Sequence, residues 1–231
     1  MPCSHLFRIM LTLPLLALGG SGAAQVPPSA EERSHYAGVF AAALAGDAGE
    51  IERLARTGQA IDARDAHGRT PLHVAAYVRR HDAMRALVRL GANPNALDRD
   101  RYDIVTIAAV ADDVPTLETA LDLGASAKNV TSPYEGTALI AAAHLGHDGV
   151  VRTLVRAGAP LDHVNNLGWT AVIESIVLGD GGARHQATLQ ALVDAGANVD
   201  LPDRNGQTPL ALARSRGYER MADILRKARP R

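Results

Sequence analysis

Residues 68–76 read GRTPLHVAA, and this stretch decides the fold. Thr70 followed by Pro71 is the arrangement that a helix start requires. A threonine oxygen can accept a hydrogen bond from a free amide of the first turn, and proline at the first helical position sacrifices no useful donor. The small and branched apolar residues that follow predict a thin helix that packs closely on another backbone. His73 lies inside this helix start, so the sequence raises the question of whether it does chemistry or holds the fold together.

The stretch has copies elsewhere in the chain. GQTPLALA at 206–213 repeats it closely, and GTALIAAA at 136–143 and GWTAVIES at 168–175 repeat it more weakly. A second signal runs out of phase with the first: a glycine recurs at positions 58, 91, 124, 158 and 196, at spacings of 33, 33, 34 and 38 residues. Self-similarity at such a period predicts a solenoid of stacked supersecondary units.

Two linked patterns recur together and in order. D-x-x-G-x-T-P-L-H-x-A-A is followed by G-H-x-x-V-V-x-x-L-V-x-x-G-A-x-x-N over nearly all of the chain after about residue 35, and residues 64–96 form the clearest copy. In these patterns the sequence resembles the ankyrin repeat family. The resemblance implies an all-α repeat solenoid, in which helix-turn-helix units stack on one another and finger loops join them.

We expect one ankyrin-repeat domain at 35–231 with six units, at about 35–63, 64–96, 97–129, 130–163, 164–201 and 202–231. The first unit lacks the TPLH signature and is expected to cap the solenoid, since the outer faces of terminal repeats meet water. In the third unit Asp103 and its neighbours replace TPLH, so we expect a less securely capped helix. In the fifth unit GDGGARHQ lies between the helices. With no strand before it we expect a longer interhelical loop there, protruding as a contact, rather than a phosphate-binding loop.

The first two dozen residues have a different composition. MPCSHLFRIMLTLPLLALGGSGAAQ carries one basic residue, Arg8, then an apolar run from Ile9 to Leu18, and then small residues. This is the layout of a secretory signal peptide, which we expect at 1–24 with cleavage between Ala24 and Gln25, followed by a linker at 25–34. The alternative is an N-terminal membrane anchor, for which the apolar run is short.

Composition limits the classes of function. The formal net charge is −1 and no basic patch with interleaved aromatics occurs, so we expect no nucleic-acid partner. Cys3 is the only cysteine and precedes the apolar run, so the mature chain would enter an oxidising compartment without disulfides. The basic residues are nearly all arginine, a bias typical of GC-rich bacteria. We therefore expect an exported bacterial protein, periplasmic or secreted.

Signatures of catalysis are missing from the sequence. It contains no G-x-S-x-G elbow, no H-E-x-x-H, no C-x-x-C pair and no P-loop, so we expect no enzyme activity, no cofactor and no metal. The resemblance implies a structural hydrogen-bonding role for His73 and for His147. The spaced aspartates at 98–103 lack the glycine and the terminal glutamate of a calcium loop. His144 and His147 are three residues apart, but the repeat pattern already accounts for His147.

Function is expected at the surface, because a scaffold of this kind does not by itself dictate function. In the ankyrin pattern, exposed positions flank the motif glycine of each finger and follow the double alanine of each first helix. Transferred to this chain, the expected partner-binding residues are His67, Arg69, Tyr77, Arg99, Asp100, Tyr102, Tyr134, His144, Leu167, Trp169 and Arg204.

Aromatic residues are concentrated in this set. The chain has only five tyrosines and one tryptophan, and three of the tyrosines and the tryptophan belong to it. Such rings dominate binding hot spots, so the sequence predicts a concave protein-binding face and a monomeric, non-catalytic interaction module. Two alternatives stay open. The rings could serve only to pack on neighbouring fingers, or the protein could be a periplasmic metal or small-ligand sensor that uses His67, His144 or the loop at 179–186.

Overall fold

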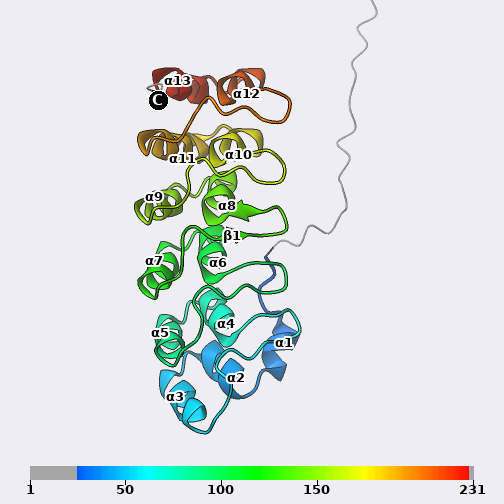
Figure 1. The fold of residues 1–231 in the computed structure, drawn as a ribbon, viewed down its shortest axis with the longest axis vertical. Helices are drawn as coiled ribbons and strands as arrows, with labels where there is room; N and C mark the ends of the chain where they lie inside the picture. The colour runs from blue at the N-terminus through cyan, green and yellow to red at the C-terminus, as the bar shows by residue number, and fades with distance from the viewer. Residues whose placement is uncertain (1–24, 229–231) are drawn as a thin grey trace, which may run out of the picture.

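The computed structural model describes residues 25–228, which form an elongated stack of helix pairs (Figure 1). The expected signal peptide at 1–24 lies outside the described residues. The first helices of the pairs are α2 (Gly38–Ala45), α4 (Pro71–Tyr77), α6 (Ile104–Val110), α8 (Ala138–Leu145), α10 (Ala171–Val177) and α12 (Pro209–Ser215). The second helices are α3 (Ala48–Arg56), α5 (His81–Arg89), α7 (Val114–Asp122), α9 (Asp148–Arg156), α11 (Ala183–Asp194) and α13 (Glu219–Lys227). One pair lies within each of the six expected units.

Side-chain caps start the first helices. Thr70 accepts a hydrogen bond from the backbone amide of His73, and equivalent threonines cap the three later helices that begin with one, at Thr137, Thr170 and Thr208. At the third unit the Asp103 carboxylate accepts from the Thr106 amide at 2.8 Å. The expectation of a weak cap at this unit was wrong, because aspartate is as good an N-cap as serine or asparagine.

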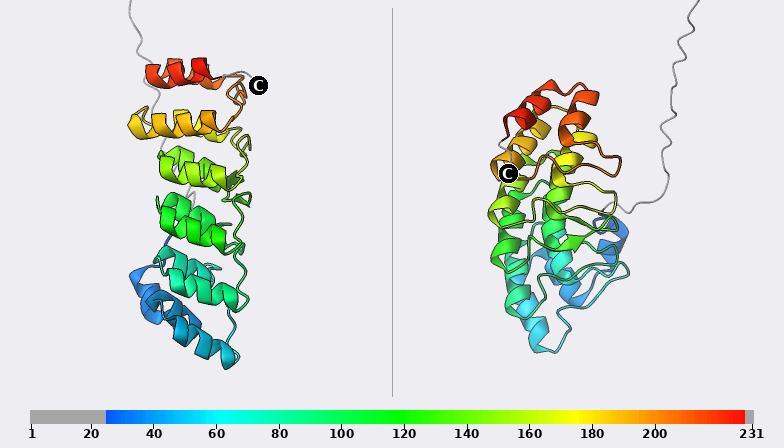
Figure 2. Two further views of the ribbon diagram at one scale, coloured as in Figure 1. Left: turned by 90° about the vertical axis from the view of Figure 1, so that its left-hand side faces the viewer. Right: turned by 45° about the horizontal axis from the view of Figure 1, so that its top comes forward.

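The two rows of helices pack through small and branched residues. Ala75, Ala108 and Ala142 of the first helices are fully buried, and so are Leu87 and Leu154 of the second helices. One continuous apolar core runs from α2 to α13. In the turned view, the second helices lie one above another along the stack (Figure 2). Each repeat therefore relies on its neighbours to bury its apolar surface. The predicted all-α repeat solenoid is confirmed.

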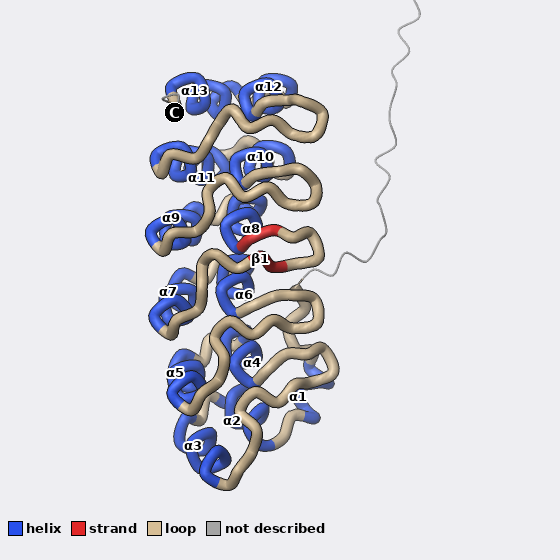
Figure 3. The backbone as a smooth tube through the Cα atoms, viewed as in Figure 1, coloured by secondary structure: helices blue, strands red, loops and turns tan. Residues whose placement is uncertain are grey.

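Finger loops on one side of the stack are joined by backbone hydrogen bonds. Consecutive fingers are bridged from Arg99 N to His67 O, from Ser132 N to Arg101 O and from Asn166 N to Tyr134 O, at 2.9, 3.0 and 3.0 Å. Gly68 has a φ of +73°, and an added Cβ would stand 2.9 Å from the amide nitrogen of Arg99, so this finger requires glycine. The finger of the fourth repeat contains a short antiparallel pair, β1 (Val130–Thr131) and β2 (Gly136–Thr137), marked in red in Figure 3.

Residues 25–34, expected to be a linker, are instead part of the fold. They contain most of helix α1 (Ala30–His35), which begins with a capping box. Glu32 N donates to Ser29 Oγ at 3.1 Å, and Ser29 N donates to a Glu32 carboxylate oxygen at 2.6 Å. We call residues 25–36 the N-terminal arm. Its helix lies beside the fingers of the first repeats (Figure 1). Among residues 25–228, none of the helices is long and apolar enough to cross a membrane.

Candidate binding groove

The expected binding residues of the first finger hold the N-terminal arm. Arg69 is only 1% exposed, and its Nε donates to Asp65 Oδ2 at 2.7 Å. The same guanidinium pairs with Glu32 of α1 and donates to the carbonyl oxygen of Val26 at 3.2 Å. Arg69 is therefore an internal anchor, and the expectation that it contacts a partner was wrong. The cause is the ordered arm, whose carboxylate draws the cation inward.

The anchor extends to the residues around Arg69. Tyr36 of the arm donates its hydroxyl to Asp65 at 2.7 Å, and His67 lies 3.0 Å from Glu32 with its side chain half-exposed. Burial alone would raise the pKa of Asp65, but hydrogen bonds from Tyr36 and Arg69 lower it below its usual range. The arm, the first finger and these charges form one hydrogen-bonded unit.

Two of the expected aromatic contacts are structural. Tyr102 is only 7% exposed, and Tyr77 is partly buried against the core. Burial raises the pKa of both phenols. Both rings pack against the fold, as the packing alternative expects, and their contact with a partner stays a prediction. Of the remaining expected residues, Arg99 and Arg204 are exposed at finger tips and Asp100 is half-buried.

The other expected residues meet around a cavity on the finger side of the stack. Tyr134, His144, Leu167 and Trp169 line a cavity of about 410 Å³ between α6, α8, α10 and their fingers. Its walls also include Tyr102, Val110, Ile140, Leu145, Asn165, Glu174 and Leu178, and Gln25 of the arm lies at it. We call this cavity the groove. Its wall is mostly apolar, a composition typical of a binding site.

Apolar side chains of the groove remain open to solvent. Tyr134, Leu145, Leu167 and Leu178 are 38–44% exposed, whereas Leu72, Ile104 and Leu139 of the first helices are buried. A cluster of such side chains around one cavity marks an interaction site more often than scattered ones do. Of the expected binding residues in this region, Tyr134, His144 and Leu167 are exposed, and Trp169 is half-buried.

A carboxyl group lies at the inner wall of the groove. The side chain of Glu174 on α10 is 5% exposed, and its Oε1 accepts a hydrogen bond from Asn165 Nδ2 at 2.9 Å. Asn165 Oδ1 in turn accepts from the amides of Leu167 and Trp169, which fixes the amide side chain in the finger. Burial raises the pKa of Glu174 to about 7, and the Asn165 bond opposes that shift.

His144 is the cationic candidate nearest to this carboxyl. Its Nδ1 lies 3.6 Å from Glu174 Oε2, beyond hydrogen-bond distance. Burial lowers the pKa of His144, and the neighbouring His185 lowers it further. Both effects disfavour the charged imidazole, so His144 is a weak counter-charge for Glu174.

Sequence reasoning missed Glu174, although a signal was present. It occupies the fourth residue after the capping residue, where the other repeats from the second onward have Val74, Ile107, Ala141 and Leu212. An ionisable residue in this apolar column is unusual and marks the helix that carries it. Comparison of the repeats shows that this position is otherwise apolar. A single glutamate in a helix does not, however, indicate by its sequence alone that it is buried.

The histidines of the repeat motif do have structural roles. His73 is buried, with Nδ1 bonded to Thr70 at the helix start and Nε2 3.1 Å from the carbonyl oxygen of Tyr102. His147 Nδ1 lies 2.9 Å from the carbonyl oxygen of Ala109 in the preceding repeat. Both side chains join consecutive repeats, so the question raised by GRTPLHVAA is answered in favour of the fold.

The loop at 179–186 does not protrude as expected. His185 Nδ1 lies 2.8 Å from Asp180, and its Nε2 lies 2.9 Å from the carbonyl oxygen of His144. Arg184 pairs with Asp112 at 2.5 Å, and Tyr218 donates to the Gly179 carbonyl at 3.0 Å. These bonds tie the insertion to its neighbours on both sides. Among residues 25–228 no group of three metal-ligating side chains is assembled, so the metal-sensor alternative gains no support.

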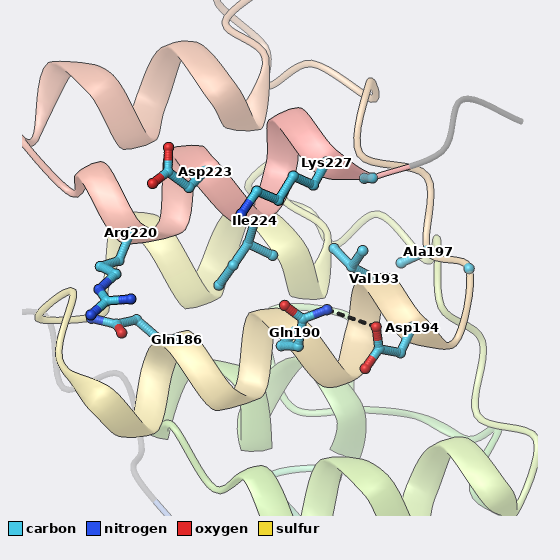
Figure 4. Close-up of a pocket in the computed structure, with 11 residues that line it drawn as sticks. Gln186, Gln190, Val193, Asp194, Ala197, Arg220, Asp223, Ile224 and Lys227 are labelled. Carbon is cyan, nitrogen blue, oxygen red and sulfur yellow. Dashed lines mark hydrogen bonds between the residues drawn. The ribbon is translucent and has the colours of Figure 1, made fainter.

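A second cleft lies between α11 and α13, on the row of second helices (Figure 4). Its polar groups are engaged with their own helices: Gln190 donates to Asp194 at 2.7 Å, and Asp223 pairs with Arg226. Arg220 and Lys227 line it from α13 and add charge without a buried polar group at its base. It offers less chemistry for recognition than the groove.

Comparison with known proteins identifies the same architecture. The ankyrin repeat family profile matches residues 67–99 and 135–166. The Escherichia coli (strain K12) protein YahD, named as an ankyrin repeat protein, is 33% identical over 185 residues, which cover 80% of this chain and 92% of YahD.

Solved structures agree with the sequence comparison. An ankyrin repeat domain from Acinetobacter baumannii AYE is 40% identical with a TM-score of 0.76, over 82% of this chain and 96% of that one. The ankyrin repeat domain of Bcl-3, described as a member of the IkappaB protein family, is 25% identical with a TM-score of 0.75, over 85% and 88%. From its fold, its repeat motif and these relatives, the chain belongs to the ankyrin repeat family.

Proposed function

We propose that this protein is a non-catalytic interaction module that holds a partner protein in the groove. Ankyrin repeats are protein–protein interaction modules and are generally non-catalytic scaffolds. The observation that supports the groove as the contact surface is the cluster of Tyr134, Leu145, Leu167 and Leu178, exposed around one cavity. Solvent-exposed apolar area of this kind gains free energy when a partner covers it.

The arm restricts where a partner can bind. Arg69 and its ion pairs occupy the first finger, whereas the groove between α6 and α10 stays open. We propose that the partner contacts the groove and the exposed tips of Arg99 and Arg204, and that the module is a monomer with no nucleic-acid partner. We further propose export to the periplasm or medium, on the strength of the signal-peptide layout at 1–24.

Partner capture with two matched variants tests this function. Leu167 and Leu90 are 39% and 38% exposed, but Leu167 lines the groove and Leu90 follows α5 in the second row. A partner captured by wild type and by Leu90→Glu should be lost with Leu167→Glu, because a carboxylate in the groove must be desolvated on binding. Equal loss with both variants, or retention by both, would place the contact elsewhere. Thermal unfolding of each variant confirms that it is folded.

A further inference from the structure

The groove holds an acidic group whose second oxygen has only a long contact with a histidine. Glu174 Oε1 accepts a hydrogen bond from Asn165, and Oε2 lies 3.6 Å from His144 Nδ1, a distance that suits a weak ion pair and exceeds a hydrogen bond. The side chain is 5% exposed, so water solvates the carboxylate poorly. A buried carboxylate with an open coordination site is costly unless it is protonated or paired with a cation.

The groove wall offers only a histidine as that cation. Lysine and arginine are absent from the side chains that line the cavity among residues 25–228. The titratable groups on the packed elements are His144 of α8, His185 of α11, and the phenols of Tyr102 and Tyr134. His185 is engaged with Asp180, and burial lowers the pKa of His144, which disfavours its cationic form. A permanent cation for the ionised Glu174 would come from outside the groove.

The approach to the carboxyl is apolar. Leu145, Leu167 and Leu178 border the cavity, and the ring of Trp169 lies in its wall. Such a channel suits methylene groups, and an indole face also attracts a cation. A long aliphatic side chain with a charged end would place its methylene groups against the apolar wall and its charge at the Glu174 carboxylate.

We propose that the groove receives a lysine or arginine side chain of the partner protein, with its cationic end on Glu174 Oε2 and flanking apolar residues on Tyr134 and the three leucines. This inference rests on the proposed function and specifies the chemistry of the partner. Charge-assisted bonds of this kind are about twice as strong as neutral ones and fix register.

Peptide pools test the proposal directly. Acetylated and amidated pentapeptides carry lysine, arginine, norleucine, glutamine or glutamate at the centre, with flanking positions drawn from leucine, valine, phenylalanine and alanine. Binding is followed by the fluorescence of Trp169, the one tryptophan of the chain, at about pH 8 and about pH 5.5. At the higher pH we expect the lysine and arginine pools to bind roughly 10-fold more tightly than the norleucine pool.

The pH dependence has a defined sign. A cation binds the ionised form of Glu174, so binding of the basic pools must release a proton and weaken as pH falls below about 7. If the glutamine pool bound more tightly than the basic pools at about pH 8, Glu174 would be acting as a protonated donor to an acceptor, and the proposal would be overturned.

Two glutamate variants provide the control. Glu174→Gln should remove the preference for basic pools, whereas Glu118→Gln, the same change at an exposed site on α7, should keep it. Equal binding of norleucine and lysine pools would overturn the cationic specificity while leaving the groove as an interaction site. If none of the peptide pools bound to the protein, the proposed cationic specificity would also be overturned. The Leu167→Glu capture experiment then shows separately whether the groove binds a protein at all.

Discussion

At the scale of single residues, the position of Glu174 matters more than its charge. Val74, Ile107 and Leu212 occupy the same place in other repeats and are buried as apolar side chains. A carboxyl there loses hydration and gains only a long ion-pair contact with His144, and burial raises its pKa to about 7. The repeat geometry thus turns an ordinary glutamate into a group that titrates near neutral pH.

Glu174 should make the stability of the protein depend on pH. The folded protein holds this proton between about pH 4.5 and 7, while the unfolded chain has already released it. The free energy of unfolding contributed by this residue therefore falls as pH rises through that window, by about 3 kcal/mol in total. Urea unfolding of wild type and Glu174→Gln should diverge above pH ~5, with the variant more stable at pH ~8. If the free energies of unfolding of wild type and Glu174→Gln changed with pH in parallel, the buried carboxyl would be contradicted. Glu118→Gln, by contrast, is expected to run parallel to wild type.

His73 should matter for stability and leave recognition intact. His73→Leu removes the bonds to Thr70 and to the Tyr102 carbonyl, and we expect a loss of about 2 kcal/mol. In wild type, burial lowers the pKa of His73, so its contribution is present above the unfolded value of about 6.5 and is lost as pH falls below it. Chemical unfolding measures the loss, and partner capture at a permissive temperature should be unchanged. A folded variant that no longer captures the partner would assign His73 to the interface.

At the scale of elements, the N-terminal arm and the insertion both fix neighbouring repeats through ion pairs and hydrogen bonds. The arm fastens α1 to the first finger through Arg69, 37 residues after Glu32 in the chain. The insertion fastens α11 to the third repeat through Arg184 and to the fourth repeat through His185. Neither segment belongs to the repeat pattern, and each satisfies polar groups of an adjacent repeat.

Removing the anchor should release the arm before the stack unfolds. Arg69→Met leaves the carboxylates of Asp65 and Glu32 without their cation, which should cost ~2–4 kcal/mol because Arg69 and Asp65 are buried. Limited trypsin digestion should then cleave after Arg33 sooner than in wild type. Arg99→Met, a change at the exposed tip of the next finger, serves as the control. Unchanged cleavage at Arg33 in Arg69→Met would show that the arm is held by other contacts.

At the scale of the whole molecule, stability is distributed along the stack. The apolar core is continuous from α2 to α13, so each interface depends on the repeats on both sides. The finger side carries a strongly apolar opening at the fourth and fifth repeats. A partner that fills it would contact fingers of consecutive repeats and stabilise the stack by mass action.

Export should leave a defined mature end. Expression in a bacterial host with fractionation should place the protein outside the cytoplasm, with Gln25 as its first residue, because small residues at 23 and 24 precede the expected cleavage site. N-terminal sequencing or intact mass measures the end directly. An intact mass that includes residues 1–24 would argue for the membrane-anchor alternative or against export.

Local sequence was sufficient to predict the fold because short motifs mark the helices of most repeats. Threonine or aspartate caps, double alanines and glycine stops act within a few residues, and their recurrence fixes the stacking. The groove was half predicted: Tyr134, Leu167 and Trp169 belong to it, while Tyr77 and Tyr102 are largely enclosed. Equivalent positions in the motif differ in exposure because different neighbours cover them, and the motif carries no information about those neighbours.

The sequence by itself determined the solenoid, the number of helix pairs, the starts of most helices and the structural role of His73. Only the tertiary structure decided that the N-terminal arm folds onto Arg69, that the loop at 179–186 braces its neighbours, and that Glu174 lies buried beside an open cavity. The physical reason is range. Caps and stops act between residues a few positions apart in the chain, whereas an ion pair or hydrogen bond of each of these three features joins residues 30 to 41 positions apart.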